Sequence, residues 1–164
     1  MASSYSTRLK IELIGSGEQS NSWGNTTNNT FSNTFDEAIS GVYSKNLAAA
    51  SSPLTLTSSN GPVTAANNEV RQAAIRFHGH NTAFIIQTIA VERVQFIIND
   101  GTVNGTITMR LGASGNTIDI APGGRVLLAT DGTNWYPLQN VSYTHLRAHE
   151  TLRYLVCRLL LEKK

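Results

Sequence analysis

Residues 106–111 read Thr-Ile-Thr-Met-Arg-Leu, and their apolar side chains alternate strictly with polar ones. This period of two is expected of a β-strand that has one face in a core and the other in water. Two further segments between residues 73 and 138 show the same alternation. In one of them, Val94, Phe96 and Ile98 alternate with Arg93, Gln95 and Asn99. In the other, Ile118 and Ile120 alternate with Thr117 and Asp119.

Short strands separated by Gly, Asn and Asp are typical of an all-β protein. Asp100-Gly101 and Asp131-Gly132 each follow a predicted strand. Asp-Gly is favoured in hairpin turns because both central residues need positive φ. We therefore predict a small antiparallel β-sandwich or jelly-roll-like module. Its strands are expected at residues 73–78, 82–89, 93–99, 106–111, 117–120, 125–129 and 135–138.

Three predicted strands carry apolar side chains on both faces. Their consecutive apolar residues are Phe84-Ile85-Ile86, Phe96-Ile97-Ile98 and Val126-Leu127-Leu128. A small sandwich buries only one face of each sheet, so another element or another subunit must cover the second set. This pattern favours an oligomer.

A short amphipathic helix is predicted before the β module. Phe31, Phe35 and Ile39 recur at helical spacing, and Thr26–Asn28 offer side chains that can cap its start. We expect about four turns with these apolar residues as the packing stripe, and Trp23 as the aromatic that covers one end. These four residues are the predicted structural anchors.

The chain divides into four parts. Residues 1–43 form a strand-helix element, whose strand is predicted at Arg8–Ile14 from strict alternation. Residues 44–67 are rich in Ala, Ser, Thr and Asn and are interpreted as a linker with one short strand at Leu54–Thr57. Residues 68–140 form the β-sandwich module, and residues 141–164 have a different composition.

Residues 141–164 read VSYTHLRAHETLRYLVCRLLLEKK and resemble a transposase-type sequencing adapter translated in one frame. The common adapter bases give Val141–Thr151, and the index and following bases give the remainder. The alternative is an Arg-rich amphipathic helix that binds a membrane or nucleic acid. We exclude this tail from the fold and function reasoning, and we expect the natural protein to continue differently after residue 140.

Without the tail, the charge of the chain changes sign. The full chain has 13 Lys and Arg against 11 Asp and Glu, a net charge of +2, but five of the basic and two of the acidic residues lie in the tail. Residues 1–140 therefore keep eight basic and nine acidic residues, a net charge of −1. This balance gives no basis for nucleic-acid binding. The tail also holds the only Cys, which excludes thiolate chemistry from the body.

Several segments of residues 1–140 resemble tail-fibre and related tail structural proteins of tailed bacteriophages, especially marine ones. In the N-terminal part they are Tyr5-Ser-Thr-Arg-Leu-Lys-Ile-Glu-Leu13, Gly15-Ser-Gly-Glu-Gln-Ser20, Trp23-Gly-Asn-Thr-Thr-Asn-Asn29 and Glu37-Ala-Ile-Ser-Gly41. In the second part, Pro53–Thr57, Asn68–Arg71 and Asp131–Trp135 resemble a small β module that recurs in those fibres.

This resemblance implies a virion structural protein of the phage tail. It implies that residues 1–43 attach or trimerise, that the protein forms a homotrimer, and that other tail proteins are its partners. The alternative is a carbohydrate-binding adhesin module that contacts a host surface glycan. A depolymerase fragment carried by the fibre is less favoured.

The sequence predicts no enzyme, no cofactor and no membrane insertion. The carboxylates are scattered among turns and strand faces, whereas acid–base catalysis needs a closely held pair. Residues 1–7 lack the apolar core of a signal peptide, and the body has no long apolar run.

Two pairs of residues remain as candidate sites. His78 and His80 flank Gly79 and could converge on a metal ion, but a turn between strands is the favoured interpretation because no third ligand type lies nearby. Trp135 and Tyr136 could stack on a sugar ring, or they could close the end of the sandwich. For both pairs the sequence favours the structural role over the binding role.

Overall fold

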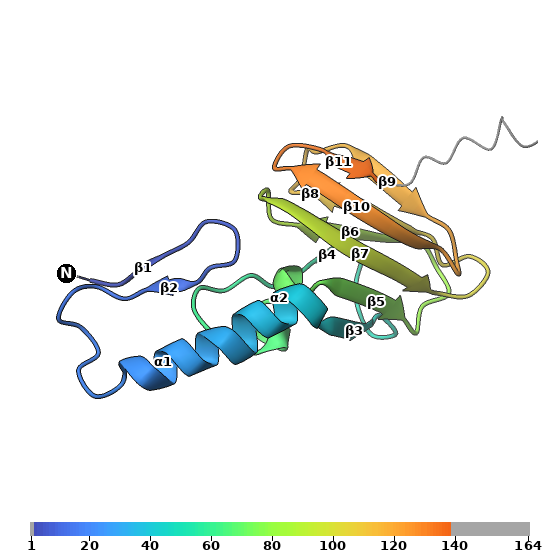
Figure 1. Cartoon of the computed structure of the whole chain (residues 1–164). Helices are drawn as coiled ribbons and strands as arrows, with labels where there is room; N and C mark the ends of the chain where they lie inside the picture. The colour runs from blue at the N-terminus through green and yellow to red at the C-terminus, as the bar shows by residue number, and fades with distance from the viewer. Residues whose placement is uncertain (1, 139–164) are drawn as a thin grey trace, which may run out of the picture.

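The computed structural model describes residues 2–138, so the adapter interpretation of residues 141–164 concerns a segment outside the described residues. The strands that follow the helix form two sheets (Figure 1). The first sheet has the order β11-β10-β7-β5-β3 and the second β4-β6-β8-β9. The first contains β3 (Val42–Asn46), β5 (Ala74–His78), β7 (Glu92–Asp100), β10 (Arg125–Asp131) and β11 (Trp135–Pro137). The second contains β4 (Leu54–Thr55), β6 (Phe84–Thr88), β8 (Ile107–Leu111) and β9 (Thr117–Ile120).

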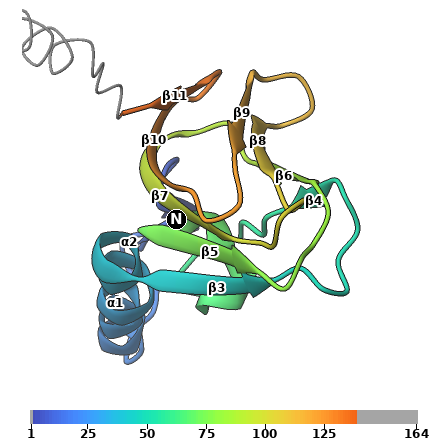
Figure 2. The same cartoon turned by 90° about the vertical axis from the view of Figure 1, so that its right-hand side faces the viewer.

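From β3 to β8 the chain crosses from one sheet to the other with every strand. We call one strand in the first sheet and the next strand in the second sheet a circuit. Consecutive circuits lie beside one another, so β3, β5 and β7 are parallel in the first sheet and β4, β6 and β8 are parallel in the second. After β8 the chain reverses, and β9 pairs antiparallel with β8, β10 with β7, and β11 with β10. Figure 2 shows the molecule from a direction in which the two sheets can be told apart.

The mainly β fold is confirmed, but the antiparallel arrangement is wrong for these four parallel pairings. Parallel neighbours need a long crossover connection, and here the strand in the opposite sheet supplies it. Alternation within one strand carries no information about the direction of its partner. The predicted strands themselves agree with β5 to β11 to within two residues at each end.

One apolar core lies between the two sheets. In the first sheet Ile75 pairs with Ile97, and in the second Ile86 pairs with Met109, and all four side chains are fully buried. The same cluster includes Phe77, Phe84, Ile107, Leu111, Ile120, Leu128 and Trp135. The inward alternation predicted for residues 106–111 is therefore confirmed.

The predicted phase of β7 is wrong. Gln95 and Asn99 are buried, whereas Val94 is exposed. The Asn99 Nδ2 donates to the carbonyls of Gly105 and Ile120 at 2.8 Å each. Buried amides are tolerated when they are hydrogen-bonded. These acceptors lie 6 and 21 residues further along the chain, outside β7, so alternation within the strand could not reveal them.

Only one of the two Asp-Gly hairpins is present. Asp100-Gly101 follows β7, but the next strand lies in the other sheet, so that prediction is wrong. Asp131-Gly132 does join the antiparallel pair β10 and β11, with Gly132 at φ 89°. The Asp131 Oδ1 accepts the backbone N–H groups of Thr133 at 2.8 Å and Asn134 at 2.7 Å, which holds this loop closed.

Residues 44–67 are not a linker. They include most of β3 and all of β4, and Leu47 and Leu56 are buried in the core. The error has a simple cause: the strands here are short, and this segment contributes only Leu47 and Leu56 as buried large apolar residues among many Ala, Ser and Thr. This segment completes the first circuit of the two sheets.

The N-terminal part differs from the predicted strand and helix. The predicted strand at Arg8–Ile14 is wrong, because Lys10 has φ 58° and only β2 (Glu12–Leu13) pairs, antiparallel with β1 (Ser4–Tyr5). The helix starts earlier than predicted, so Thr26–Asn28 lie inside it and do not cap it. It consists of α1 (Trp23–Thr30), a π-helical stretch (Phe31–Asp36) and α2 (Glu37–Ser40).

Candidate functional site

The apolar stripe of the helix points away from the protein core. Trp23 is 62% exposed, Phe31 61% and Ile39 78%. Phe35 is partly buried and contacts Phe31, with ring centroids 5.7 Å apart. The expectation that these residues anchor the helix to the core is therefore wrong for Trp23, Phe31 and Ile39. Thr30 and Thr34 are the buried residues of the helix instead.

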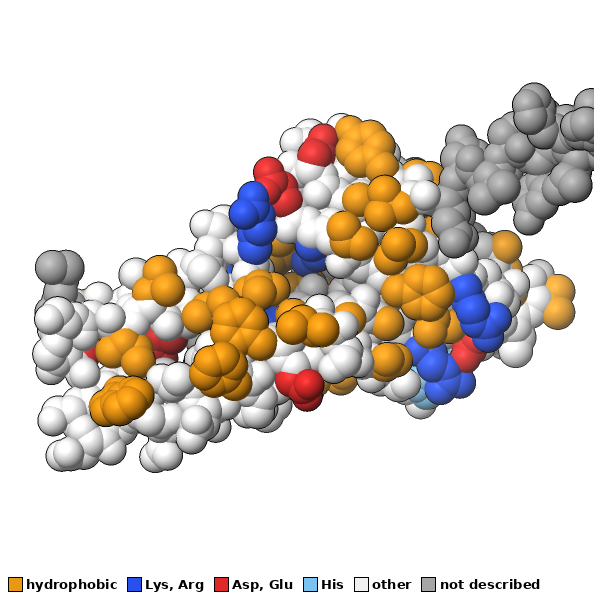
Figure 3. All heavy atoms as spheres, in the orientation of Figure 1, with side chains coloured by type: hydrophobic (Ala, Val, Ile, Leu, Met, Phe, Trp, Pro, Cys, Tyr) orange, Lys and Arg blue, Asp and Glu red, His pale blue; other side chains and the backbone are white. Residues whose placement is uncertain are grey.

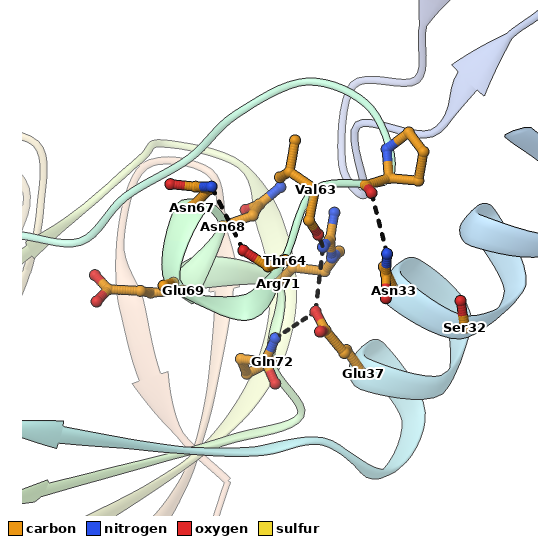
Figure 4. A network of polar contacts seen from close by, with 12 residues as sticks. Ser32, Asn33, Glu37, Val63, Thr64, Asn67, Asn68, Glu69, Arg71 and Gln72 are labelled. Atoms are coloured by element: carbon orange, nitrogen blue, oxygen red, sulfur yellow. Dashed lines mark hydrogen bonds and ion pairs between the residues drawn. The ribbon is translucent and has the colours of Figure 1, made fainter.

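The helix is held to the sheets by polar contacts (Figure 4). The Glu37 Oε2 accepts hydrogen bonds from Arg71 Nη2 at 3.1 Å and from Gln72 Nε2 at 2.7 Å. One turn earlier, Asn33 Nδ2 donates to the Pro62 carbonyl at 3.2 Å. These contacts turn the polar side of the helix inward, and the aromatic side consequently faces out.

Arg71 is the centre of this docking contact. Its guanidinium is buried and also donates to the carbonyls of Gly61 at 3.2 Å and Val63 at 2.6 Å. Nearby, the buried Glu69 binds Lys45 of β3 at 2.6 Å and accepts the backbone N–H of Thr57 at 3.0 Å. Sequence reasoning missed these charged residues, because no periodic pattern predicts that a Glu and an Arg two positions apart are both buried.

A row of apolar residues crosses the outer face of the first sheet. The strand register places Val42 beside Ala74, Ala74 beside Phe96, and Phe96 beside Leu127. Val42 and Val94 on this face are 63% and 58% exposed. We call Phe31, Phe35, Ile39, Val42, Val94, Phe96 and Leu127 the apolar face. Figure 3 shows hydrophobic side chains gathered over the helix and over this sheet on one side of the molecule.

Charged residues border the apolar face at the end of β7. The Asp100 carboxylate forms ion pairs with Arg76 of β5 and, at 3.9 Å, with Arg125 of β10. The hydrogen bond from Arg76 and the nearby positive charges hold the pKa of Asp100 below its usual range. A polar border around an apolar centre is the ordinary composition of a protein–protein interface.

The structure does not bring His78 and His80 together. His78 lies at the end of β5 near Asp100, partly exposed, whereas His80 is buried. The His80 ring contacts Phe84 edge-on at 5.8 Å, and its Nε2 lies 3.0 Å from the Gly105 carbonyl. Residues 2–138 contain no group of three or more His, Cys, Asp or Glu that could hold a metal ion. The two His side chains therefore lie in different environments, one partly exposed and one buried.

Trp135 and Tyr136 point to opposite faces of β11. Trp135 is buried in the core, with the Arg93 guanidinium 5.4 Å from its ring centroid. Tyr136 is exposed, and its hydroxyl donates to Asp131 Oδ2 at 3.0 Å. They do not form a joint stacking platform. Of the two, only Tyr136 is exposed and could contact a sugar ring, as the glycan-binding alternative would require.

Within the described part of the chain, no helix is long and apolar enough to cross a membrane. Comparison of the sequence and structure with protein families, with curated proteins and with solved structures found no match in any of the three.

Proposed function

We propose that this protein is a non-enzymatic structural component of a bacteriophage tail fibre, located in the virion and assembled as a homotrimer. The proposal joins the resemblance of its N-terminal and β segments to tail-fibre proteins with one structural observation. That observation is the apolar face, in which Phe31, Ile39, Val42 and Val94 remain 58–78% exposed among the described residues.

The apolar face has the properties of a surface that binds another subunit. Single exposed apolar residues are ordinary, but several large ones gathered on one side of a helix and a sheet are unusual for a monomer. Burial of apolar area stabilises association by roughly 25 cal/mol for each Å² removed from water. In a homotrimer the three copies turn the same surface toward the threefold axis, so their apolar faces can pack together there in a closed assembly.

The two sheets support a finer proposal for the module. We assign residues 42–138 to a β-sandwich whose first half is coiled in parallel circuits and whose second half is antiparallel. In this arrangement the inner face of each sheet supplies the core, and the outer face of the first sheet remains for assembly. Other tail proteins are the proposed partners of the N-terminal element.

The test is the mass of the full chain in solution, measured by size-exclusion chromatography with light scattering. We expect a trimer for the unmodified protein. The double variant Ile39→Lys, Val94→Lys places two charges on the apolar face, and we expect it to shift the mass toward that of a monomer. The matched control is Val103→Lys, because Val103 is 89% exposed in the loop after β7 and lies outside the apolar face.

A well-folded monomer at all concentrations would contradict the assembly proposal. Equal masses for the double variant and the Val103→Lys control would show that another surface drives association. Circular dichroism of each variant establishes that a change in mass is not caused by unfolding.

A further inference from the structure

A hollow of about 240 Å³ lies between the N-terminal hairpin, the helix and β7. Three arginines from three separate elements line it. Arg8 comes from the loop between β1 and β2, Arg71 from the 3-10 turn Glu69–Arg71, and Arg93 from β7. Figure 3 shows basic side chains inside a depression above the helix on this side of the molecule.

The carboxylates near the hollow do not balance these three cations. Arg8 forms an ion pair with Glu92, and Arg71 pairs with Glu37. Arg93 has no carboxylate partner among the described residues. Its two terminal nitrogens donate to the carbonyls of Val70 and Ile89, each at 3.4 Å, and its guanidinium lies 5.4 Å from the Trp135 ring centroid. Three arginines and two glutamates therefore surround the hollow, which leaves one positive charge without a partner.

Two guanidinium groups also have donors to spare. The Nε atoms of Arg71 and Arg93 are both buried, and neither has a hydrogen-bond acceptor within residues 2–138. A buried donor without an acceptor is costly, more so on a charged group. Burial lowers the pKa of Arg93 to about 10, which leaves the group cationic at neutral pH.

We propose that this hollow binds a small oxyanion, a carboxylate, phosphate or sulfate group, held by Arg93 and Arg71 with Arg8 at the entrance. Guanidinium groups match these anions because their planar forks donate two parallel hydrogen bonds. Typical ligand pockets measure roughly 300–1,000 Å³, so this smaller hollow suits a single anionic group. Glu92 at the rim and Glu37 beside Arg71 limit the site to one such group.

Two sources could supply this chemistry: a free inorganic anion, or a carboxylate on an acidic sugar. The experiment titrates the full chain with sodium phosphate, sodium sulfate and sodium glucuronate at constant ionic strength, with chloride as the reference. The measured signals are the Nε–H resonances of the arginines in nitrogen–proton NMR spectra. We expect saturable shifts for Arg71 and Arg93, and the anion with the tighter binding identifies the source.

Arg125 provides the internal control, because it is exposed and lies at the start of β10, at the opposite end of the β7–β10 pair from Arg93. Equal shifts at Arg125 and Arg93 would mean general charge screening and would overturn the proposal, as would a lack of saturation with all three anions. The variant Arg93→Gln is expected to weaken binding by about tenfold or more, the effect of one charge-assisted hydrogen bond. Arg125→Gln should leave the affinity unchanged. Unchanged affinity in Arg93→Gln would also overturn the assignment, and if that variant does not fold, the titration of the unmodified protein decides.

Discussion

Replacement of Glu37 by Ala tests whether polar docking holds the helix to the sheets. The change removes the acceptor for Arg71 and Gln72 and leaves the buried Arg71 guanidinium without its carboxylate. Asp36→Ala is the matched control, because Asp36 is the preceding residue on the same helix and is exposed.

The structure sets the size of the expected effect. A hydrogen bond to a charged group contributes about 1.5–3 kcal/mol, and removal of one partner of a buried ion pair costs about 3–5 kcal/mol. The Glu37 side chain keeps 19% of its surface exposed, whereas that of Arg71 keeps 1%. Water can therefore replace part of the lost contact, and we expect the free energy of unfolding to fall by about 3 kcal/mol. Asp36→Ala should change it by less than about 0.5 kcal/mol.

Denaturant unfolding followed by tryptophan fluorescence measures this difference. Trp135 is buried in the core and reports on the sheets, so the measurement uses a Trp23→Phe background to remove the exposed indole. The protein concentration is held constant, because association also contributes to apparent stability. If Glu37→Ala and Asp36→Ala have the same stability, the ion pair does not secure the helix and the reasoning is refuted.

Three further predictions concern other parts of the chain. Asn99→Ala removes the amide that donates to the Gly105 and Ile120 carbonyls, and we expect a loss of about 2–4 kcal/mol in denaturant unfolding; a loss no larger than that of the exposed Asn104→Ala control would contradict the buried role. The folded-state pKa of Asp100 is lowered, so its contribution to stability is present above its unfolded pKa of about 3.9 and is lost as the pH falls through the folded value. Arg76→Gln should raise that pKa toward its ordinary value in a carboxyl NMR titration, and an unchanged pKa would disprove the assigned cause. An independent clone of the gene should lack codons for residues 141–164, and their persistence would end the adapter interpretation.

Strand positions could be predicted from the sequence because each strand has its own local pattern. The buried face of residues 106–111 was predicted correctly, because only one of their two faces is apolar. Both faces of β7 carry apolar residues, and the buried face is the one on which Gln95 and Asn99 find hydrogen-bond acceptors. Those acceptors lie in other segments, so alternation favoured the wrong face.

The helix stripe has a similar explanation. Phe31, Phe35 and Ile39 do share one side of the helix, but spacing alone does not say whether that side meets the core. Its direction is set by Glu37 and Arg71, which are 34 residues apart in the chain. The surplus of apolar side chains on the strands was correctly predicted, and the structure places Phe96 and Leu127 on the outer face of the first sheet. The arginine-lined hollow could not be predicted, because three distant segments form it.

The winding path has a consequence for how such a protein changes in length. Each circuit bonds to the one before it, and partners on β5 and β7 lie 22 positions apart, as residues 74 and 96 show. The reversal after β8 finishes one end of the stack, whereas β3 and β4 are edge strands at the other. A longer version of this architecture would therefore gain a whole turn ahead of β3, and its existing strands would keep their dimensions.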